Sequence, residues 1–183
     1  MTEPAELPQL RTPDQHAEGV LQVPDDVQVL EGTPRGGRRG VAVVVSRFNG
    51  EITSQLLTSA LEELDRAGVA RESVTVVPVP GAFELPLATL ALAKTRRFSC
   101  VVALGCVIRG ETAHFDYVAS EAASGLQLAA IETGVPVSFG VLTVDTREQA
   151  EARIDRAADA VRTALEMADV FSQLRAQAAG PLS

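Results

Sequence analysis

The sequence predicts an α/β protein, a three-layer sandwich with a four-stranded parallel sheet flanked by helices. Short β-branched runs without polar alternation, such as VAVVVS from position 41, are typical of strands buried on both faces. Each run is followed by apolar residues at helical spacing, and this strand and helix unit occurs four times. Consecutive units of this kind join parallel strands by right-handed crossovers, with helices on both faces of the sheet.

The elements follow one another in a regular order. After the strand at 41–46, Ile52, Leu56 and Leu64 mark one face of a helix that ends at the glycine signal Ala67-Gly68. The remaining strands are predicted at 73–79, 100–108 and 135–144. Helices are predicted from about Phe83 to Lys94, from about Phe115 to Thr133, and from Arg147 towards the end, where RIDRAADAVRTALEMADV is one continuous helical run.

The chain before position 41 has a different composition, with five of the ten prolines in its first forty residues. We expect residues 1–26, which include His16, to be a disordered extension, because they cannot bury enough apolar surface to offset their ordering entropy. Residues 27–40 are predicted to be a linker, in which the weak alternation of DVQVLEG (26–32) allows a short edge strand and TPRGGRRG is a flexible basic hinge. The domain itself spans 41–175, and residues 176–183 form a C-terminal tail.

Composition disfavours several classes of protein. With 24 acidic and 16 basic residues the net charge is −8, the wrong sign for neutralising nucleic-acid phosphates. Cys100 and Cys106 would face the same side of one strand about 20 Å apart, beyond disulfide reach. Two cysteines without a histidine cluster predict no metal site. The sequence contains no apolar run long enough for a membrane span and no basic, apolar leader, so we expect a cytoplasmic protein without membrane contact.

The unusual residues follow the predicted strands, where parallel sheets bind their ligands. Phe48 comes directly after the first strand and is either a stacking platform for a planar ligand or a core residue beneath the next helix. Pro80-Gly81-Ala82 predicts a tight turn that a ligand can approach closely. Glu84 then lies in the first turn of a helix, where it is either a ligand contact or a charge that complements the helix dipole.

The loop after the third strand, RGETAHF, is the most informative. Gly110 permits an unusual turn, and Thr112 can cap the following helix, whose first N–H groups form an anion site. His114 would lie one short turn from that anion. Imidazole is the usual general acid or base near neutral pH, so His114 is either catalytic or an ordinary loop residue.

Four motifs occur in order between positions 40 and 170, namely VVVSRFNGEIT, VPGAFELPLA, VVALGCVIRGETAHFDYV and FGVLTVDTREQAEAR. Together they resemble the 6,7-dimethyl-8-ribityllumazine synthase family of riboflavin biosynthesis. The resemblance implies a flavodoxin-like subunit that condenses 5-amino-6-(D-ribitylamino)uracil with L-3,4-dihydroxy-2-butanone 4-phosphate, releasing phosphate and water, without metal or organic cofactor. It also implies a homo-oligomer, a pentamer or a multiple of it, with riboflavin synthase as a partner.

The resemblance assigns a role to each matching residue. His114 is the acid/base residue, and Phe139 and Arg153 come from a neighbouring subunit. The contacts that it implies for the ribitylaminouracil are Phe48, Asn49, Ala82, Phe83, Glu84, Val107, Ile108 and Phe139, and those for the phosphate are Gly110, Glu111, Thr112 and Arg153.

The sequence departs from the family pattern after Arg153. The family continues there through a glycine-rich loop with a lysine, whereas this chain is about five residues shorter, and Lys94 is its only lysine. Arg156 or Arg162 would have to substitute, although a guanidinium does not replace an ammonium like for like. The shortened segment supports an alternative function, a non-catalytic relative that binds flavin or lumazine or forms a shell. A generic nucleotide-binding domain is disfavoured, because no glycine-rich nucleotide fingerprint follows the first strand.

Overall fold

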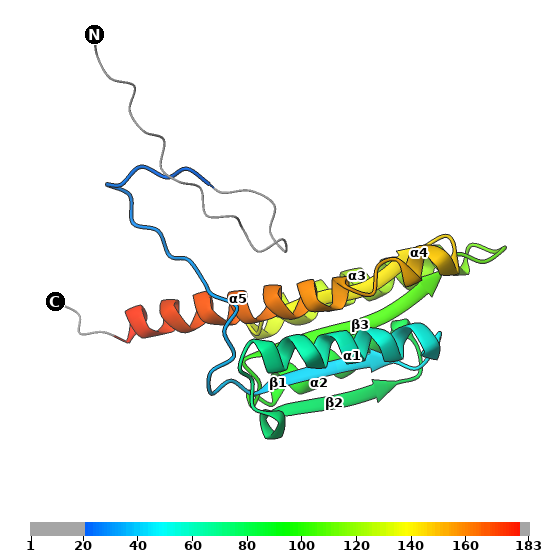
Figure 1. Cartoon of the computed structure of the whole chain (residues 1–183), viewed down its shortest axis with the longest axis horizontal. Coiled ribbons are helices and arrows are strands. Elements are labelled where there is room, and N and C mark those ends of the chain that lie inside the picture. Colours follow the sequence, from blue (N-terminus) through cyan, green and yellow to red (C-terminus); the bar gives the residue numbers. More distant parts are fainter. Residues whose placement is uncertain (1–20, 180–183) are drawn as a thin grey trace, which may run out of the picture. The chain divides into compact units, whose positions relative to one another are not determined.

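The structure is a computed structural model that describes residues 21–179. Most of the expected disordered extension and the last four residues of the expected tail lie outside this range. The elements are β1 (Val41–Ser46), α1 (Gly50–Arg66), the 3₁₀ turn η1 (Arg71–Ser73), β2 (Val74–Val79), the 3₁₀ turn η2 (Ala82–Glu84), α2 (Leu85–Lys94), β3 (Cys100–Ile108), α3 (His114–Thr133), β4 (Val137–Val144), α4 (Arg147–Glu151) and α5 (Arg156–Ala178) (Figure 1).

The sheet has the strand order β2-β1-β3-β4, and every neighbouring pair is parallel. Every residue of β1 is buried, and β3 is buried along all but its last residue. These are the two central strands, and their unbroken apolar sequences satisfy burial on both faces. The predicted four-stranded parallel sheet is confirmed.

The core lies on both faces of the sheet. One cluster packs Val41 and Val43 with α1 and α5, and the other packs Ala42 and Val44 with α2 and α3. Alternate residues of a strand point to opposite faces, so each central strand supplies both clusters. Cys100 and Cys106 both lie in the α1 and α5 cluster, on one side of β3 as expected.

The predicted linker is attached to the domain rather than free. Residues 1–30 and 31–183 form separate units, and residues 31–39 belong to the second. Gly36 N–H donates to the Ala67 carbonyl oxygen at 2.8 Å. The Asp169 carboxylate of α5 accepts hydrogen bonds from Arg39 Nη2 at 2.6 Å and from Thr33 N–H at 3.1 Å. The interpretation of TPRGGRRG as a flexible hinge is therefore wrong, and residues 31–39 are called the strap below.

The edge strand allowed at 26–32 does not form. Within the described part of the first unit, residues 21–30, one turn joins Val27 N–H to the Pro24 carbonyl oxygen at 3.0 Å, and no strand is present. In the second unit Gly32 lies so close to α5 that an added Cβ would sit 2.3 Å from the Glu166 carbonyl oxygen. The chain at Gly32 therefore packs on a helix and not on a sheet edge.

The expected continuous helix from Arg147 is interrupted. α4 ends at Glu151, and α5 begins at Arg156 after a turn in which Arg153 and Arg156 N–H donate three residues back. Such i→i+3 bonds wind the backbone more tightly than an α-helix. α5 then continues to Ala178, three residues beyond the expected domain boundary. No helix among residues 21–179 has the length and apolar character needed to cross a membrane.

Candidate active site

The carboxyl ends of all four strands lie at one edge of the sheet, because the strands are parallel (Figure 1). This edge is called the carboxyl edge. The segments that follow the four strands there are 47–49, 80–84, 109–113 and 145–155. Most of the predicted site residues lie in these segments or among the last residues of the strands. The sheet topology therefore gathers motifs that are far apart in the sequence.

Phe48 is held at this edge by its backbone, with its ring in solvent. Its N–H donates to the Pro80 carbonyl oxygen at 3.0 Å, while Arg47 N–H donates to Val79 O at 2.8 Å. The Phe48 residue is 70% exposed. The alternative that Phe48 packs in the core is therefore excluded, and its role as a stacking platform stays a prediction.

Asn49 fixes the turn that follows Phe48. Its backbone is left-handed, with φ 57°, and its side-chain Nδ2 donates to the Cys106 carbonyl oxygen at 2.9 Å. Asparagine tolerates this conformation better than most residues. The amide thereby ties the start of α1 to β3 beyond the last β1 to β3 register pair, Val45 and Leu104. Asn49 therefore positions the turn, and its amide nitrogen donates within the protein.

The segment after β2 is a 3₁₀ turn rather than the start of an α-helix. Ala82 is buried, whereas Phe83 is 57% exposed. Glu84 Oε2 accepts a hydrogen bond from Gly81 N–H at 2.9 Å, as part of a capping box. This bond fixes the direction of the carboxylate, so Glu84 is more than a charge at a helix start.

Segment 109–113 is exposed, and His114 is the first residue of α3. Two details differ from expectation. Gly110 has no left-handed backbone, so the unusual turn that glycine permits is not used. Ala113, not Thr112, is the N-cap residue, and Thr112 Oγ1 accepts only a long hydrogen bond from His114 N–H at 3.4 Å. His114, Glu111 and Thr112 are all open to a ligand.

Val107 and Ile108 form the end of β3, opposite Thr143 and Val144 of β4. Phe139 lies earlier on β4, opposite Ala103, five residues before the strand ends, which corresponds to about 16 Å along a strand. It is 47% exposed. The fold therefore does not bring Phe139 to the carboxyl edge of the same chain.

Arg153 lies in the turn between α4 and α5 and is exposed. Its Nη1 donates to the Gln149 carbonyl oxygen at 2.8 Å, and no described carboxylate pairs with it. Arg162, in contrast, is bound to Glu63 at 3.1 Å and to Asp159 at 2.6 Å on the side of α1. Arg162 is thus part of the fold, whereas Arg156 is exposed and pairs only with Asp159, at 3.1 Å.

Sequence reasoning missed Arg109. Its Nε donates to Asp145 Oδ1 at 3.1 Å, its Nη1 lies 3.1 Å from Asp116 Oδ1, and its guanidinium carbon lies 4.1 Å from the centre of the Phe115 ring. Partial desolvation would lower the pKa of Arg109, but the hydrogen bonds to Asp116 and Asp145 raise it overall. The signal in the sequence was Asp145, an acidic residue directly after β4, the strand that pairs with β3.

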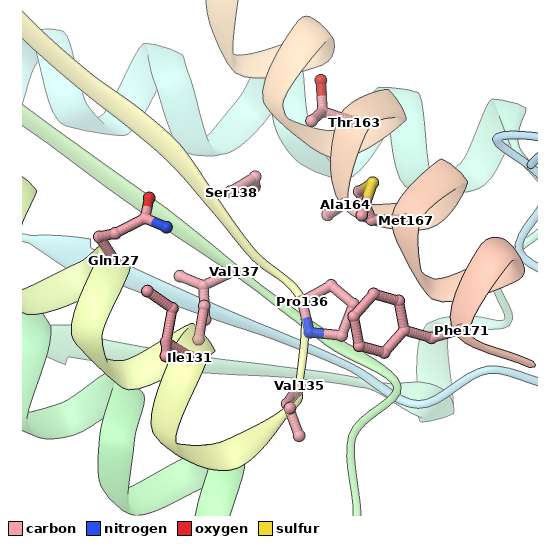
Figure 2. Close-up of a pocket in the computed structure, with 12 residues that line it drawn as sticks. Gln127, Ile131, Val135, Pro136, Val137, Ser138, Thr163, Ala164, Met167 and Phe171 are labelled. Atoms are coloured by element: carbon pink, nitrogen blue, oxygen red, sulfur yellow. The ribbon is translucent and has the colours of Figure 1, made fainter. Parts of the chain in front are cut away.

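A groove elsewhere in the described residues does not include these residues. It has a volume of about 430 Å³ and lies between α3 and α5 at the start of β4, lined by Ile131, Pro136, Met167 and Phe171 among others (Figure 2). Its lining is mainly apolar and includes no predicted site residue. At the carboxyl edge, the side chains of Phe48, Phe83, Glu111 and His114 are exposed.

The fold defines a parallel α/β protein, a class whose ligands usually bind at the carboxyl ends of the strands, where the polar and aromatic residues described above lie. The family model described as 6,7-dimethyl-8-ribityllumazine synthase matches residues 39–172. A 6,7-dimethyl-8-ribityllumazine synthase of Edwardsiella ictaluri (strain 93-146) is 48% identical over 159 residues, covering 82% of this chain and 100% of that protein. Proteins of the same name from Yersinia pestis (strain Pestoides F) and Yersinia pseudotuberculosis (serotype O:1b, strain IP 31758) are 46% identical over 155 residues, covering 81% of this chain and 99% of each. The chain belongs to the 6,7-dimethyl-8-ribityllumazine synthase family.

Proposed function

We propose that this protein is a cytoplasmic lumazine synthase, a transferase that condenses 5-amino-6-(D-ribitylamino)uracil with L-3,4-dihydroxy-2-butanone 4-phosphate. The products are 6,7-dimethyl-8-ribityllumazine, phosphate and water, and riboflavin synthase is the partner that receives the lumazine. The observation that carries this proposal is the placement of Phe48, Glu84 and His114 at one edge of the sheet in a member of this family. No metal or organic cofactor takes part.

The pyrimidine substrate binds along segments 47–49 and 82–84. Phe48 stacks on the planar ring, and Glu84 accepts hydrogen bonds from the ribityl hydroxyls through the carboxylate oxygen that does not cap Gly81. Ala82 and Phe83, together with the end of β3 at 107–108, provide backbone and apolar contacts. Asn49 supports this surface through its bond to Cys106 and lies beside the ribityl chain.

The phosphate of the second substrate binds at segment 110–112, at the start of α3. Backbone N–H groups at a helix N-terminus favour an anion, and the forked guanidinium of Arg153 adds charge-assisted hydrogen bonds. Arg153 is suited to this role because no described carboxylate competes for it. Arg156 is the better candidate for the missing lysine, because its side chain is exposed and has a single carboxylate partner, Asp159, whereas Arg162 is partly buried between Glu63 and Asp159.

His114 moves the protons. Imine formation between the amine and the ketone releases one water, and phosphate then leaves as the carbon skeleton loses a proton. The second amine adds to the remaining carbonyl carbon and closes the ring with loss of a second water. Imidazole can donate and accept protons at successive atoms near neutral pH. Much of the remaining barrier is the entropy of bringing two substrates together, to which proximity contributes about 7–11 kcal/mol.

The active site is shared between subunits of a pentamer. Phe139 lies about 16 Å along β4 from the carboxyl edge of its own subunit, so a neighbour must supply it to the Phe48 surface. The open carboxyl edge of one subunit supports the same arrangement, because a site without walls would not exclude water. Arg153 is contributed together with Phe139.

A two-substrate assay tests the function. Purified protein is expected to form the fluorescent lumazine and to release phosphate in equal amount. Riboflavin or lumazine binding without turnover would instead establish the non-catalytic relative that the short segment after Arg153 suggests. A known synthase assayed in parallel controls for substrate quality.

Coexpression of two inactive variants tests the shared site. His114→Ala and Arg153→Ala place their defects in different subunits of one site, so mixed oligomers should recover about a quarter of the wild-type sites by random assembly. Each variant alone should remain inactive. A mixture as inactive as the single variants would mean that both residues come from one subunit.

A further inference from the structure

Arg109 joins three elements at the carboxyl edge. It is the first residue after β3, and its N–H donates to the Val144 carbonyl oxygen at 2.9 Å. Its side chain reaches Asp145 directly after β4 and Asp116 in the first turn of α3. The guanidinium also lies against the face of Phe115, at 4.1 Å from the ring centre, a favourable cation and ring geometry.

These contacts close the base of the loop that carries His114. Residues 110–114 connect Arg109 to Phe115 and Asp116, and Arg109 bonds across that connection. The loop itself is exposed, with the long Thr112 to His114 hydrogen bond inside it, and a Cβ at Gly110 would meet nothing within 4 Å. A short loop whose ends are bridged loses much of its conformational freedom. The loop is thus ordered at its base and not by packing along its length.

The local charge argues against Arg109 as a phosphate ligand. One guanidinium faces two carboxylates, Asp116 and Asp145, so the cluster adds no net positive charge at the edge. Both carboxylates hold nitrogen atoms of the fork that a phosphate would need. A guanidinium paired with two carboxylates can orient the loop but has no unpaired charge for a phosphate. Arg153, in contrast, pairs with no described carboxylate.

We propose that Arg109 is a positioning residue that clamps the 110–114 loop between β3, β4 and α3, so that the phosphate-binding N–H groups and His114 keep a fixed separation. The inference rests on the proposed function of this edge. The inference adds a specific requirement to the proposed function. Phosphate binding depends on the Asp145–Arg109–Asp116 cluster, although no residue of this cluster touches the phosphate. The side chain of Arg109 acts through the loop.

Steady-state kinetics of Arg109→Gln test the proposal. Misplacement of the loop by about 1 Å is expected to lower kcat/KM for the phosphorylated ketone by about 10- to 100-fold, mainly through a raised KM. The KM for the pyrimidine should be unchanged. Arg109→Lys keeps the charge but loses the fork, so it should restore only part of the loss. The matched control is Arg71→Gln, which breaks an exposed ion pair with Asp65 outside the site and should leave both KM values unchanged.

Asp145→Asn separates positioning from direct binding. If Arg109 positions the loop, this variant raises the KM for the phosphorylated ketone in the same direction as Arg109→Gln. If Arg109 were a phosphate ligand restrained by the carboxylate, the same variant would free it and lower that KM, which would overturn the proposal. Unchanged kinetics in both variants would also overturn it. The proposed function fails separately, if His114→Ala and Arg153→Ala leave the rate unchanged.

Discussion

The two edges of the sheet differ in how their loops are held. At the amino edge, the strap of residues 31–39 packs so closely that Cβ atoms at Gly32 and Gly36 would sit 2.3 Å from atoms of α5 and of Val69. At the carboxyl edge, loops are fixed by a few directed hydrogen bonds, and Phe48, Phe83 and His114 remain exposed. Backbone packing stabilises the amino edge, whereas the carboxyl edge leaves the side chains of the proposed site exposed.

This difference separates stability from activity. Changes at the amino edge should lower the free energy of unfolding and leave the rate per folded molecule intact. Changes at the carboxyl edge should do the reverse, since exposed side chains contribute little to the core.

The largest effect is expected for His114→Ala. Loss of a positioned acid/base residue lowers kcat by about 10²- to 10⁴-fold, equivalent to about 3–5 kcal/mol in the barrier. Because His114 is exposed at the start of α3, the thermal midpoint should change little. Lumazine fluorescence and calorimetry on the same sample measure both quantities. A lowered midpoint with an unchanged rate would contradict the role and the division together.

Gly36→Ala should have the largest effect on stability. An added Cβ would sit 2.3 Å from Val69 Cγ2 and 2.6 Å from its backbone nitrogen, and Val69 is buried. Overpacking of this kind costs about 2–3 kcal/mol, which lowers the thermal midpoint by about 5–10 °C in a domain of this size.

The neighbouring Gly37 provides the control for Gly36. A Cβ there would meet nothing within 4 Å, but its φ of +51° is left-handed, so Gly37→Ala should cost only about 1 kcal/mol of strain. Both variants should keep wild-type kcat once folded. Equal midpoints for the two variants would mean that the strap is not packed as described.

How well each part of the fold could be predicted depends on how far apart in the sequence its interacting residues lie. The fold was predictable because its signals are local, as in the buried run at Cys100–Ile108 and the helical spacing of Ile52, Leu56 and Leu64. The strap was not, because Thr33 and Asp169 are 136 residues apart, and nothing near Thr33 indicates a helix partner. The break after Glu151 escaped notice because the sequence on both sides of it has helical character.

The candidate site was predictable to the extent that topology determines it. Parallel strands bring Phe48, Glu84 and His114 to one edge, as expected for residues that follow strand ends, and their roles stay predictions. The Arg109 cluster needed the strand order, because Asp145 becomes a neighbour only when β4 lies beside β3. Phe139 and Arg153 came from the family resemblance alone. Their part in a shared site stays a prediction.

Phe48→Ala should have an intermediate effect, confined to one substrate. Stacking of an aromatic side chain on a base contributes about 1–2 kcal/mol, so the KM for the pyrimidine should rise about 5- to 30-fold. Phe48 is 70% exposed, and the free energy of unfolding should be unchanged. Phe48→Tyr keeps the ring and should keep the KM. An equal loss in both variants would show that the ring does not stack.

The smallest effect is expected for Asp169→Asn, which weakens the attachment of the strap. Desolvation would raise the pKa of Asp169, but hydrogen bonds from Arg39, Thr33 and Gln173 lower it overall from its ordinary value of 3.8. The carboxylate is partly exposed, so the loss should be about 1 kcal/mol at neutral pH. A carboxyl with a lowered folded pKa stabilises above its unfolded pKa, and that stabilisation disappears as pH falls through the folded value.

The difference in thermal midpoint between wild type and Asp169→Asn should therefore be full at pH 7 and vanish on acidification below pH 3.8. Asp65→Asn breaks the exposed pair with Arg71 and should cost less than about 0.5 kcal/mol at neutral pH. Activity should not change in either variant. A difference that persists in acid would mean that Asp169 holds the strap through its shape and not its charge, and the amino edge would then rely on packing alone.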